Sequence, residues 1–245
     1  MRYAIISDIH ANLPALLAVL RDAEAHNCGR VICLGDLIGY GDQHSECVEV
    51  VRERAASCVR GNFDDYASSV VDLSAFNPTA AEAVRQMRAD LTGEEVEWLD
   101  KLPYVAEYDG FTVVHATLDN PKRWEYVFDK HAAAASMCHQ TTQVCFFGHT
   151  HVPLAFVRQS TVKGGTYSQF KIERGNKYFI NPGSVGQPRD NNSKASYAIF
   201  DSGTNTIELR RLDYDKPSGS DGDVTCGVPV PITRPPHSAK NAKRS

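Results

Sequence analysis

The sequence lacks the features that mark membrane-bound, secreted or nucleic-acid-binding proteins. No apolar run approaches the roughly 18 residues of a membrane span, and the first predicted strand begins without a secretion signal. The 26 lysines and arginines are outnumbered by 30 aspartates and glutamates, so no excess of positive charge is available for nucleic acid or an anionic membrane. These absences predict a cytoplasmic protein that binds neither a membrane nor nucleic acid.

The seven cysteines include no C-x-x-C pair, and their number is odd. Several lie in apolar, strand-like segments, which predicts buried reduced thiols in place of a disulfide framework. A content of 42% hydrophobic and 23% charged residues is typical of a globular chain. Residues 215–245 are instead rich in Pro, Gly, Ser, Lys and Arg. We therefore expect one domain over residues 1–214 and a poorly ordered tail.

The first part of the chain alternates predicted strands with amphipathic helices. Strands are expected at residues 2–7, at 31–34 and near 58–59, and Asn12 caps the first of the two intervening helices. This rhythm predicts parallel strands joined by right-handed crossovers. Ligands bind beyond the carboxyl ends of the strands in such sheets. Those ends are therefore where functional side chains are expected.

The remaining elements are predicted from caps and turns. Thr92 with Glu95 is a capping box, and Asp109-Gly110 is typical of a two-residue hairpin turn. We expect helices at 78–91, 92–100 and 132–138, and strands at 104–108, 111–114 and 144–147. From Leu154 the pattern becomes antiparallel, with turns expected at 163–165, 174–176 and 202–203. These late strands are predicted to form the second sheet.

Seven side chains of metal-binding type follow the predicted strands: Asp8, His10, Asp36, Asn62, His115, His149 and His151. Residues two apart at a strand end share a face, which predicts that His149 and His151 point into one site. Seven nitrogen and oxygen ligands exceed one four-coordinate ion but suit two ions that share a carboxylate. Two such cations are typical of phosphoester hydrolysis. Capped strand ends and polar loops are the alternative, and His115 is predicted only in combination with the others.

These motifs resemble those of the calcineurin-like metallophosphoesterases, in particular the small bacterial branch of phosphodiesterases and nucleotide phosphatases. The resemblance is carried, in the family's order, by Asp8-Ile9-His10, Gly35-Asp36, Gly61-Asn62-Phe63-Asp64, His115 and Gly148-His149-Thr150-His151. The segment Asn181-Pro182-Gly183-Ser184 is similar to the late loop of that branch. The resemblance implies an α/β fold, the four-layer α/β/β/α sandwich of two mixed β-sheets.

The same resemblance implies roles for individual residues. Asp8, His10 and His151 would hold one metal, Asn62, His115 and His149 would hold the other, and Asp36 would bridge them. Asp36, Asn62 and His115 are thus expected at the centre of catalysis, with a hydroxide that bridges the two metals as the nucleophile. Imidazole-rich ligation suits Mn, Fe, Co, Ni or Zn better than Ca or Mg. Among these metals the resemblance implies Mn²⁺ first, because it supports activity widely in the family, with Fe, Zn, Ni or Co as alternatives.

One residue departs from the family pattern. Phe63 stands where most members have a histidine that protonates or hydrogen-bonds the leaving oxygen, a contribution typically worth ~10²–10⁴-fold in rate. Phenylalanine can do neither, and Asp64 is left without the task of orienting that histidine. We therefore expect an enzyme that favours good leaving groups, such as those of nucleotide polyphosphates or aryl phosphodiesters.

Four further residues could contact the phosphate or base of a substrate from loops around the metals: Arg60, Tyr40, Asn181 and Arg189. Salt bridges or turn formation are the alternative for each of them. The predicted partner is a small phosphoester or nucleotide. Diadenosine polyphosphates, cyclic nucleotides and other phosphodiesters stay open, and the sequence does not predict an oligomeric state.

The sequence leaves two other functions open. One is a catalytically weak metal-binding module of the same fold that acts through a protein partner, although the presence of all seven ligands argues against it. The other is a phosphomonoesterase or protein phosphatase. Such enzymes tend to need an acid for a poor leaving group, so Phe63 argues against this function too.

Overall fold

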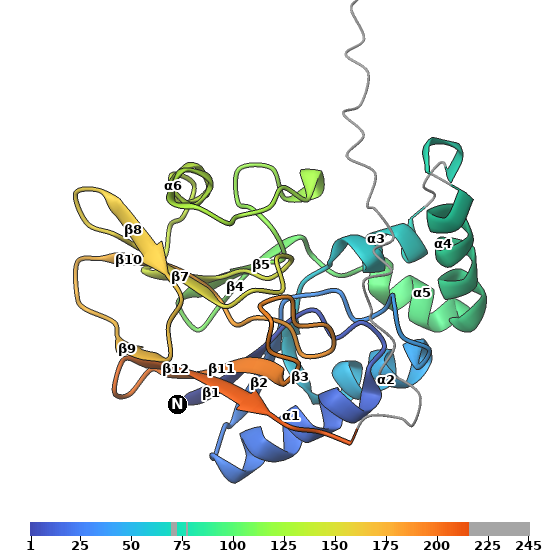
Figure 1. The fold of residues 1–245 in the computed structure, drawn as a ribbon, viewed down its shortest axis with the longest axis horizontal. Helices are drawn as coiled ribbons and strands as arrows, with labels where there is room; N and C mark the ends of the chain where they lie inside the picture. Colours follow the sequence, from blue (N-terminus) through green and yellow to red (C-terminus); the bar gives the residue numbers. More distant parts are fainter. Residues whose placement is uncertain (70–72, 77, 216–245) are drawn as a thin grey trace, which may run out of the picture.

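Two six-stranded β-sheets face each other at the centre of the protein in the computed structural model, which describes residues 1–69, 73–76 and 78–215 (Figure 1). In spatial order, the first sheet contains β3 (Ala55–Cys58), β2 (Arg30–Cys33), β1 (Arg2–Ile6), β11 (Ala195–Asp201), β12 (Thr206–Leu212) and β9 (Gln169–Lys171). The second contains β4 (Val105–Tyr108), β5 (Phe111–Val114), β6 (Val144–Phe146), β10 (Lys177–Asn181), β7 (Leu154–Arg158) and β8 (Val162–Gly165). Both sheets mix parallel and antiparallel pairs, as expected.

The first sheet extends in both directions from β1. On one side β1, β2 and β3 are parallel and are connected by α1 (Leu13–Ala25) and α2 (His44–Arg54), which confirms the predicted alternation. The side chain of Asn12 accepts a hydrogen bond from the Ala15 backbone, so the predicted cap of α1 is confirmed. On the other side β1 pairs antiparallel with β11. The carboxyl ends of three parallel strands therefore lie along one edge of this sheet.

The assignment of all late strands to the second sheet was wrong. Strands β9, β11 and β12 lie in the first sheet, whereas β4, β5 and β6 lie in the second with β7, β8 and β10. The burial of β11 gives the reason, because all its residues from Ala195 to Phe200 are buried and such a strand needs apolar cover on both faces. Tyr197 packs towards the helices, and Phe200 packs between the sheets.

One predicted turn is also displaced. Residues 163–165 belong to β8, and the chain reverses before it, where the Gln159 backbone donates to the Thr161 carbonyl. A side chain at Gly164 would lie 2.2 Å from the ring of Phe156, so this glycine allows close packing between paired strands. The hairpin at Asp109-Gly110 is confirmed, because β4 and β5 pair on either side of it and both residues have the positive φ of a type I′ turn.

The alternation of side chains along the strands produces three apolar cores. In β1, Ala4 and Ile6 face helices α1 and α2, whereas Tyr3 and Ile5 pack between the two sheets. The outer core of the first sheet continues into α3 (Asn62–Ser68), α4 (Pro78–Asp90) and α5 (Gly93–Asp100). Helix α6 (Lys130–Met137) covers the second sheet, where Met137 packs near Phe147. The result is the expected four-layer α/β/β/α sandwich (Figure 1).

Several other predictions concern the chain as a whole. The capping box of α5 is confirmed by reciprocal hydrogen bonds between Thr92 and Glu95. Within the described ranges, no helix is long and apolar enough to cross a membrane. Six cysteines are free thiols, and Cys226 lies outside the described residues. A single domain over residues 1–214 stays a prediction, and the tail predicted to be poorly ordered lies outside the described residues from position 216 onwards.

An ion pair outside the metal-binding motifs joins α1 to the late strands. Asp22 accepts hydrogen bonds from the Tyr197 hydroxyl at 2.6 Å and from the Arg210 guanidinium at 3.1 and 3.2 Å. Burial alone would raise the pKa of Asp22, but these donors lower it below its ordinary value of 3.8. The carboxylate therefore stabilises the fold above the pKa of the unfolded chain and loses this effect as the pH falls through the folded pKa.

Replacing Asp22→Asn is expected to lower the free energy of unfolding at pH 7 by ~1–3 kcal/mol, because charge-assisted hydrogen bonds are lost. The difference from the wild type should shrink below pH 3.8. Urea unfolding followed by circular dichroism, at pH 7 and at a pH below 3.8, measures the free energy of unfolding of both proteins. Glu24→Gln is the control on the same helix, since Glu24 only makes an exposed pair with Arg54. Equal effects of the two substitutions at pH 7 would contradict the prediction.

Candidate metal centre

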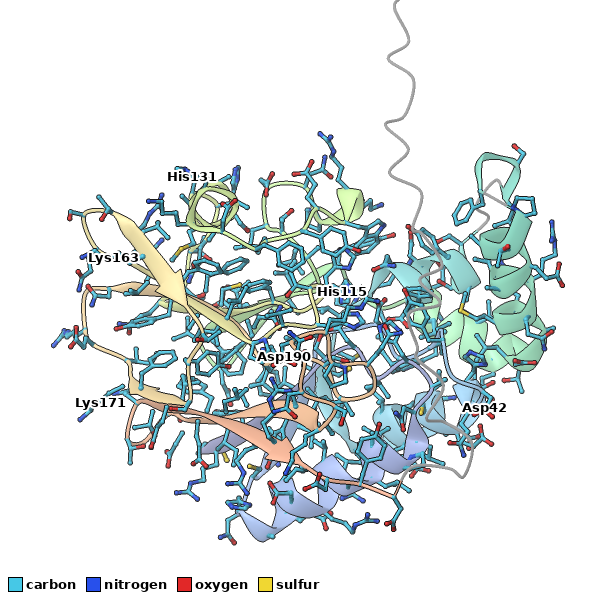
Figure 2. All side chains as sticks on the ribbon, viewed as in Figure 1. Asp42, His115, His131, Lys163, Lys171 and Asp190 are labelled. Atoms are coloured by element: carbon cyan, nitrogen blue, oxygen red, sulfur yellow. The ribbon has the colours of Figure 1, made fainter. Side chains whose placement is uncertain are left out.

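Seven polar side chains gather beyond the carboxyl ends of five strands from both sheets. They are the residues singled out in the sequence, and we call them the candidate metal centre: Asp8 and His10 after β1, Asp36 after β2, Asn62 after β3, His115 after β5, and His149 and His151 after β6. All seven are at least 97% buried. His115 is completely buried, and Figure 2 shows it near the middle of the molecule.

Five of these residues have left-handed backbone conformations. The φ angles are 54° at Asp8, 50° at His10, 54° at Asp36, 67° at His149 and 58° at His151. Each such conformation costs roughly 1–2 kcal/mol for a residue other than glycine. Strand β6 ends at Phe146, so the strand-alternation argument for His149 and His151 used the wrong backbone geometry. Backbone strain of this kind gathers at functional sites.

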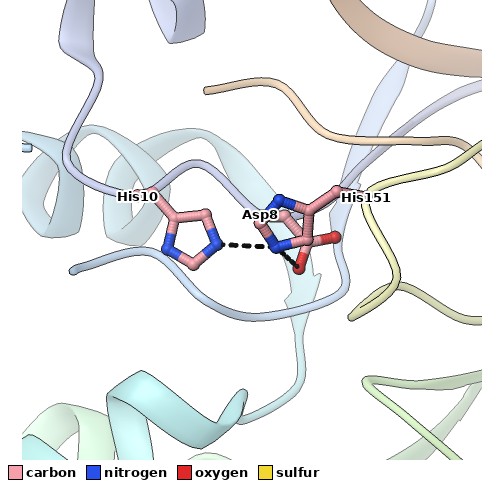
Figure 3. A group of neighbouring side chains, drawn as sticks. All are labelled: Asp8, His10 and His151. Carbon is pink, nitrogen blue, oxygen red and sulfur yellow. Dashed lines mark hydrogen bonds and ion pairs between the residues drawn. The ribbon is translucent and has the colours of Figure 1, made fainter. Parts of the chain in front are cut away.

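The first group of potential ligand atoms belongs to Asp8, His10 and His151, each of which offers one atom within 4.8 Å of the others (Figure 3). The Nε2 atoms of His10 and His151 are 3.1 Å apart, and Nε2 of His151 lies 3.4 Å from Oδ1 of Asp8. Three buried donor atoms therefore converge on one position, an arrangement that suits a divalent cation.

The second group consists of Asp36, His115 and His149, again with one atom from each within 4.8 Å of the others. Oδ2 of Asp36 is 3.3 Å from Nε2 of His115 in this group and 3.7 Å from Nε2 of His10 in the first. The Asp36 carboxylate thus lies between the two groups. Asn62 is fully buried, and neither its amide oxygen nor its nitrogen has a hydrogen-bond partner.

Each of the four histidines of the candidate metal centre has one ring nitrogen next to a backbone carbonyl oxygen. The pairs are His10 Nδ1 with Ile38 at 3.0 Å, His115 Nδ1 with Leu34 at 2.8 Å, His151 Nδ1 with Gln187 at 2.6 Å, and His149 Nε2 with Trp124 at 2.8 Å. A carbonyl can only accept, so we assign the ring N–H to that nitrogen. The lone pair of the other nitrogen then faces the centre, as in metal sites.

The buried carboxylates of Asp8 and Asp36 give this space negative charge, which favours the binding of a cation. Burial alone would lower the pKa of His115, but the carboxylates of Asp36 and Asp8 raise it well above its ordinary value. A second proton, on Nε2 of His115, thus offsets these carboxylates in the metal-free protein, and this proton must leave before the nitrogen can coordinate a cation. Burial keeps the pKa of His10 and His149 below the ordinary value, so both rings are neutral at pH 7 and can coordinate a metal.

The donor set, the free lone pairs and the unpartnered Asn62 amide together fit two divalent cations. Comparison with known proteins gives the family, because the model of the calcineurin-like phosphoesterase superfamily domain matches residues 1–205. The chain belongs to this superfamily.

Two relatives support the assignment over most of the length of this chain. The chain is 37% identical to the uncharacterized protein MJ0912 of Methanocaldococcus jannaschii, over 86% of this chain and 87% of that one. The structure of a metallophosphoesterase from Sphaerobacter thermophilus is similar with a TM-score of 0.77 and 38% identity, covering 88% of this chain and 89% of the other. A hypothetical protein of Pyrococcus horikoshii, at 19% identity and a TM-score of 0.65, shares the fold over 88% of this chain and 89% of its own.

Asp64 has a structural task that the sequence did not reveal. Its buried carboxylate accepts hydrogen bonds from the backbone nitrogens of Asp36 at 2.8 Å, Leu37 at 2.9 Å and Gly61 at 2.9 Å. A side chain at Gly61 would lie 2.2 Å from Oδ1 of Asp36, so the two loops touch directly. Asp64 therefore holds the strained backbone that carries the central carboxylate.

Asn181 supports the loop of His149 and His151 in a similar way. Its amide donates to the Gly148 carbonyl at 2.6 Å and to the Thr150 hydroxyl at 3.0 Å, and its oxygen accepts from the Gly183 backbone at 2.8 Å. The residue is completely buried. These contacts describe a residue that positions the loop, although Asn181 was singled out as a candidate substrate contact.

The other three candidate substrate contacts lie in different surroundings. The buried Arg60 guanidinium faces Asp65 at 3.0 Å and also Asp100 and the Tyr104 hydroxyl, which matches the salt-bridge alternative. Arg189 is exposed, and its guanidinium donates to the Tyr40 hydroxyl at 3.1 Å. The Tyr40 ring lies 4.8 Å from that of His10, centre to centre. Tyr40 and Arg189 therefore border the metal centre.

Replacing Asp64→Asn is expected to weaken Mn²⁺ binding by ~10–100-fold, the usual effect of losing a residue that supports a metal ligand. Titration calorimetry on metal-stripped protein measures the change. Asp65→Asn is the matched control on the next position of α3, because the Asp65 carboxylate accepts hydrogen bonds from Arg60, Ser69 and Tyr104 and not from the backbone of the Asp36 loop. Unchanged affinity in Asp64→Asn would show that the loop keeps its shape without the carboxylate.

Proposed function

We propose that the protein hydrolyses phosphodiester or phosphoanhydride bonds of a small, nucleotide-type substrate with two divalent cations, of which Mn²⁺ is the first choice. The observation that carries the proposal is the position of Asp36 between two adjoining groups of buried ligands. Asp8, His10 and His151 would hold one cation, Asn62, His115 and His149 the other, and Asp36 would contact both. Two cations so placed would acidify a water molecule and neutralise the charge of the phosphoryl group.

The residues of the centre favour substrates with good leaving groups. All four imidazoles have one ring nitrogen engaged with a backbone carbonyl and would coordinate a cation through the other, so none of them would have a free N–H for the leaving oxygen. The Phe63 ring lies 5.2 Å from that of His10 and can donate nothing. Phosphoanhydrides and aryl esters need little protonation of the leaving oxygen, whereas alkyl monoesters depend on it.

Arg189 and Tyr40 are proposed as substrate contacts at the border of the centre. The Arg189 backbone donates to the His151 carbonyl at 3.2 Å, which fixes the base of its side chain next to a proposed ligand. The guanidinium is exposed and can bind a phosphoryl oxygen, for which its planar set of donors is well suited. Asp190 lies beside it and is occupied by an ion pair with Arg211.

Metal-stripped protein reloaded with Mn²⁺ is expected to hydrolyse bis-p-nitrophenyl phosphate faster than p-nitrophenyl phosphate. Release of p-nitrophenolate measures both rates. Asp36→Ala is expected to abolish turnover, because this carboxylate would contact both cations. Two bound metals with no turnover of either ester would favour the binding module, and Phe63→His would then test whether a missing donor is the cause. Alkyl phosphomonoesters as the best substrates would refute the leaving-group argument.

Arg189→Gln is expected to lower kcat/KM for the diester by about tenfold or more, the effect of losing one charge-assisted hydrogen bond to a phosphoryl oxygen. The Mn²⁺ content should not change, since the Arg189 side chain is not among the proposed ligands. Arg85→Gln is the control, because Arg85 is an exposed arginine on α4 that pairs with Glu82. Equal activity of the two variants would exclude Arg189 as a substrate contact.

A further inference from the structure

Two exposed aromatic side chains lie beside the candidate metal centre. Tyr126 is 37% exposed and Phe128 is 55% exposed, and they are the aromatic members of the few large apolar side chains at the surface of the described residues. Val127 between them is buried in the core under α6. The segment therefore alternates like a strand, with Val127 as an anchor and both rings on the opposite side.

The two rings continue a stack that begins at a proposed metal ligand. The Tyr126 ring lies 4.2 Å from that of His149 with an interplanar angle of 15°, and the Phe128 ring lies 5.5 Å from that of Tyr126, also at 15°. The carbonyl of Trp124, in the same segment, accepts the hydrogen bond from His149. One short segment thus orients the ligand and carries the stack from the centre to the surface.

The outer end of the stack borders a hollow of about 690 Å³ between α6 and the β7–β8 hairpin. Its apolar wall includes Phe128, Phe156 and Val162, and its rim carries Lys130, His131 and Lys163. His131 and Lys163 lie on the facing sides of this region in Figure 2. Asp129 also lines the hollow, but its carboxylate accepts from the His131 and Ala132 backbones at 2.7 and 3.0 Å.

We propose that this hollow is a subsite for the base of a nucleotide, which stacks on Phe128 while the phosphate reaches the candidate metal centre. The proposal rests on the proposed function and adds to it the place where the base of the substrate binds. Stacking on an aromatic side chain is a common way in which proteins bind a base whatever its identity. Two lysines on the rim complement an anionic ligand, although the whole chain has a net charge of −4.

The test compares two diesters that release the same p-nitrophenolate: thymidine 5′-(p-nitrophenyl phosphate), which carries a base, and methyl p-nitrophenyl phosphate, which does not. Phe128→Ala in the full chain with Mn²⁺ is expected to raise KM for the thymidine ester about tenfold, the usual effect of removing one stacking contact. The kcat for this ester and both constants for the methyl ester should stay unchanged. Phe128→Trp should keep the low KM, and Phe128→Leu should not.

Matched controls separate stacking and charge from general effects. Leu17→Ala removes another exposed apolar side chain, on α1, and should leave both esters unaffected. Lys163→Ala is expected to raise KM for the thymidine ester a few-fold at low salt, whereas Lys171→Ala on β9 should not. Lys163 and Lys171 are both exposed, and Figure 2 shows them on different sheets. Equal losses for the two esters in Phe128→Ala would mean that Phe128 only supports His149, which overturns the subsite.

A binding measurement distinguishes failure of the subsite from failure of the proposed function. Titration calorimetry of metal-free protein with adenosine 5′-monophosphate and with ribose 5-phosphate should show weaker binding of the sugar phosphate, and Phe128→Ala should remove the difference. If the wild type binds the nucleotide in this way but hydrolyses neither diester, the subsite stands and the proposed function fails. Hydrolysis of both diesters with no effect of Phe128→Ala and no preference for the nucleotide overturns the subsite alone.

Discussion

The hydrogen bonds from four imidazole rings to backbone carbonyls are the interactions on which the rest of the centre depends. Each bond fixes the rotation of a ring and leaves one lone pair directed at a common space. The carbonyls belong to loops that follow β2, to the segment of Trp124 and to the late loop of Gln187. Segments distant in sequence therefore set the direction in which each ring nitrogen points, whereas the histidines supply the nitrogen atoms that can coordinate a metal.

The same arrangement explains why so much of the surrounding polar structure is buried. Residues with left-handed backbone would relax into ordinary conformations if their neighbours did not hold them. Asp64 holds the Asp36 loop through three backbone nitrogens, and Asn181 holds the loop of Gly148 and Thr150. The favourable free energy of folding in the helices and strands thus offsets the cost of the strained backbone at the proposed ligands.

The sequence was sufficient to predict the parallel half of the fold and the residues that meet at the strand ends. Those predictions rest on local signals, namely caps, the hairpin turn and polar residues that directly follow apolar strands. The partners of β11 and β9 were not predictable, because pairing depends on which faces are covered in three dimensions. Asp64 and the stack of Tyr126 and Phe128 were missed for a related reason. The residues next to Asp64, Tyr126 and Phe128 in the sequence do not indicate which distant residues these side chains contact.

The position of β1 in the middle of its sheet has a consequence for the synthesis of the protein. All seven residues of the candidate centre lie within the first 151 positions, yet one edge of β1 stays open until β11 exists. The carbonyls of Asp8 and Ser7 accept hydrogen bonds from the backbones of Gly186 and Val185, and the ring of His151 bonds to the Gln187 carbonyl. These bonds can form only once that later loop has been synthesised. A nascent chain that already carries every ligand is therefore an incomplete sheet with an exposed edge, which is prone to aggregation. The candidate metal centre can therefore reach its final geometry only after β11 has left the ribosome.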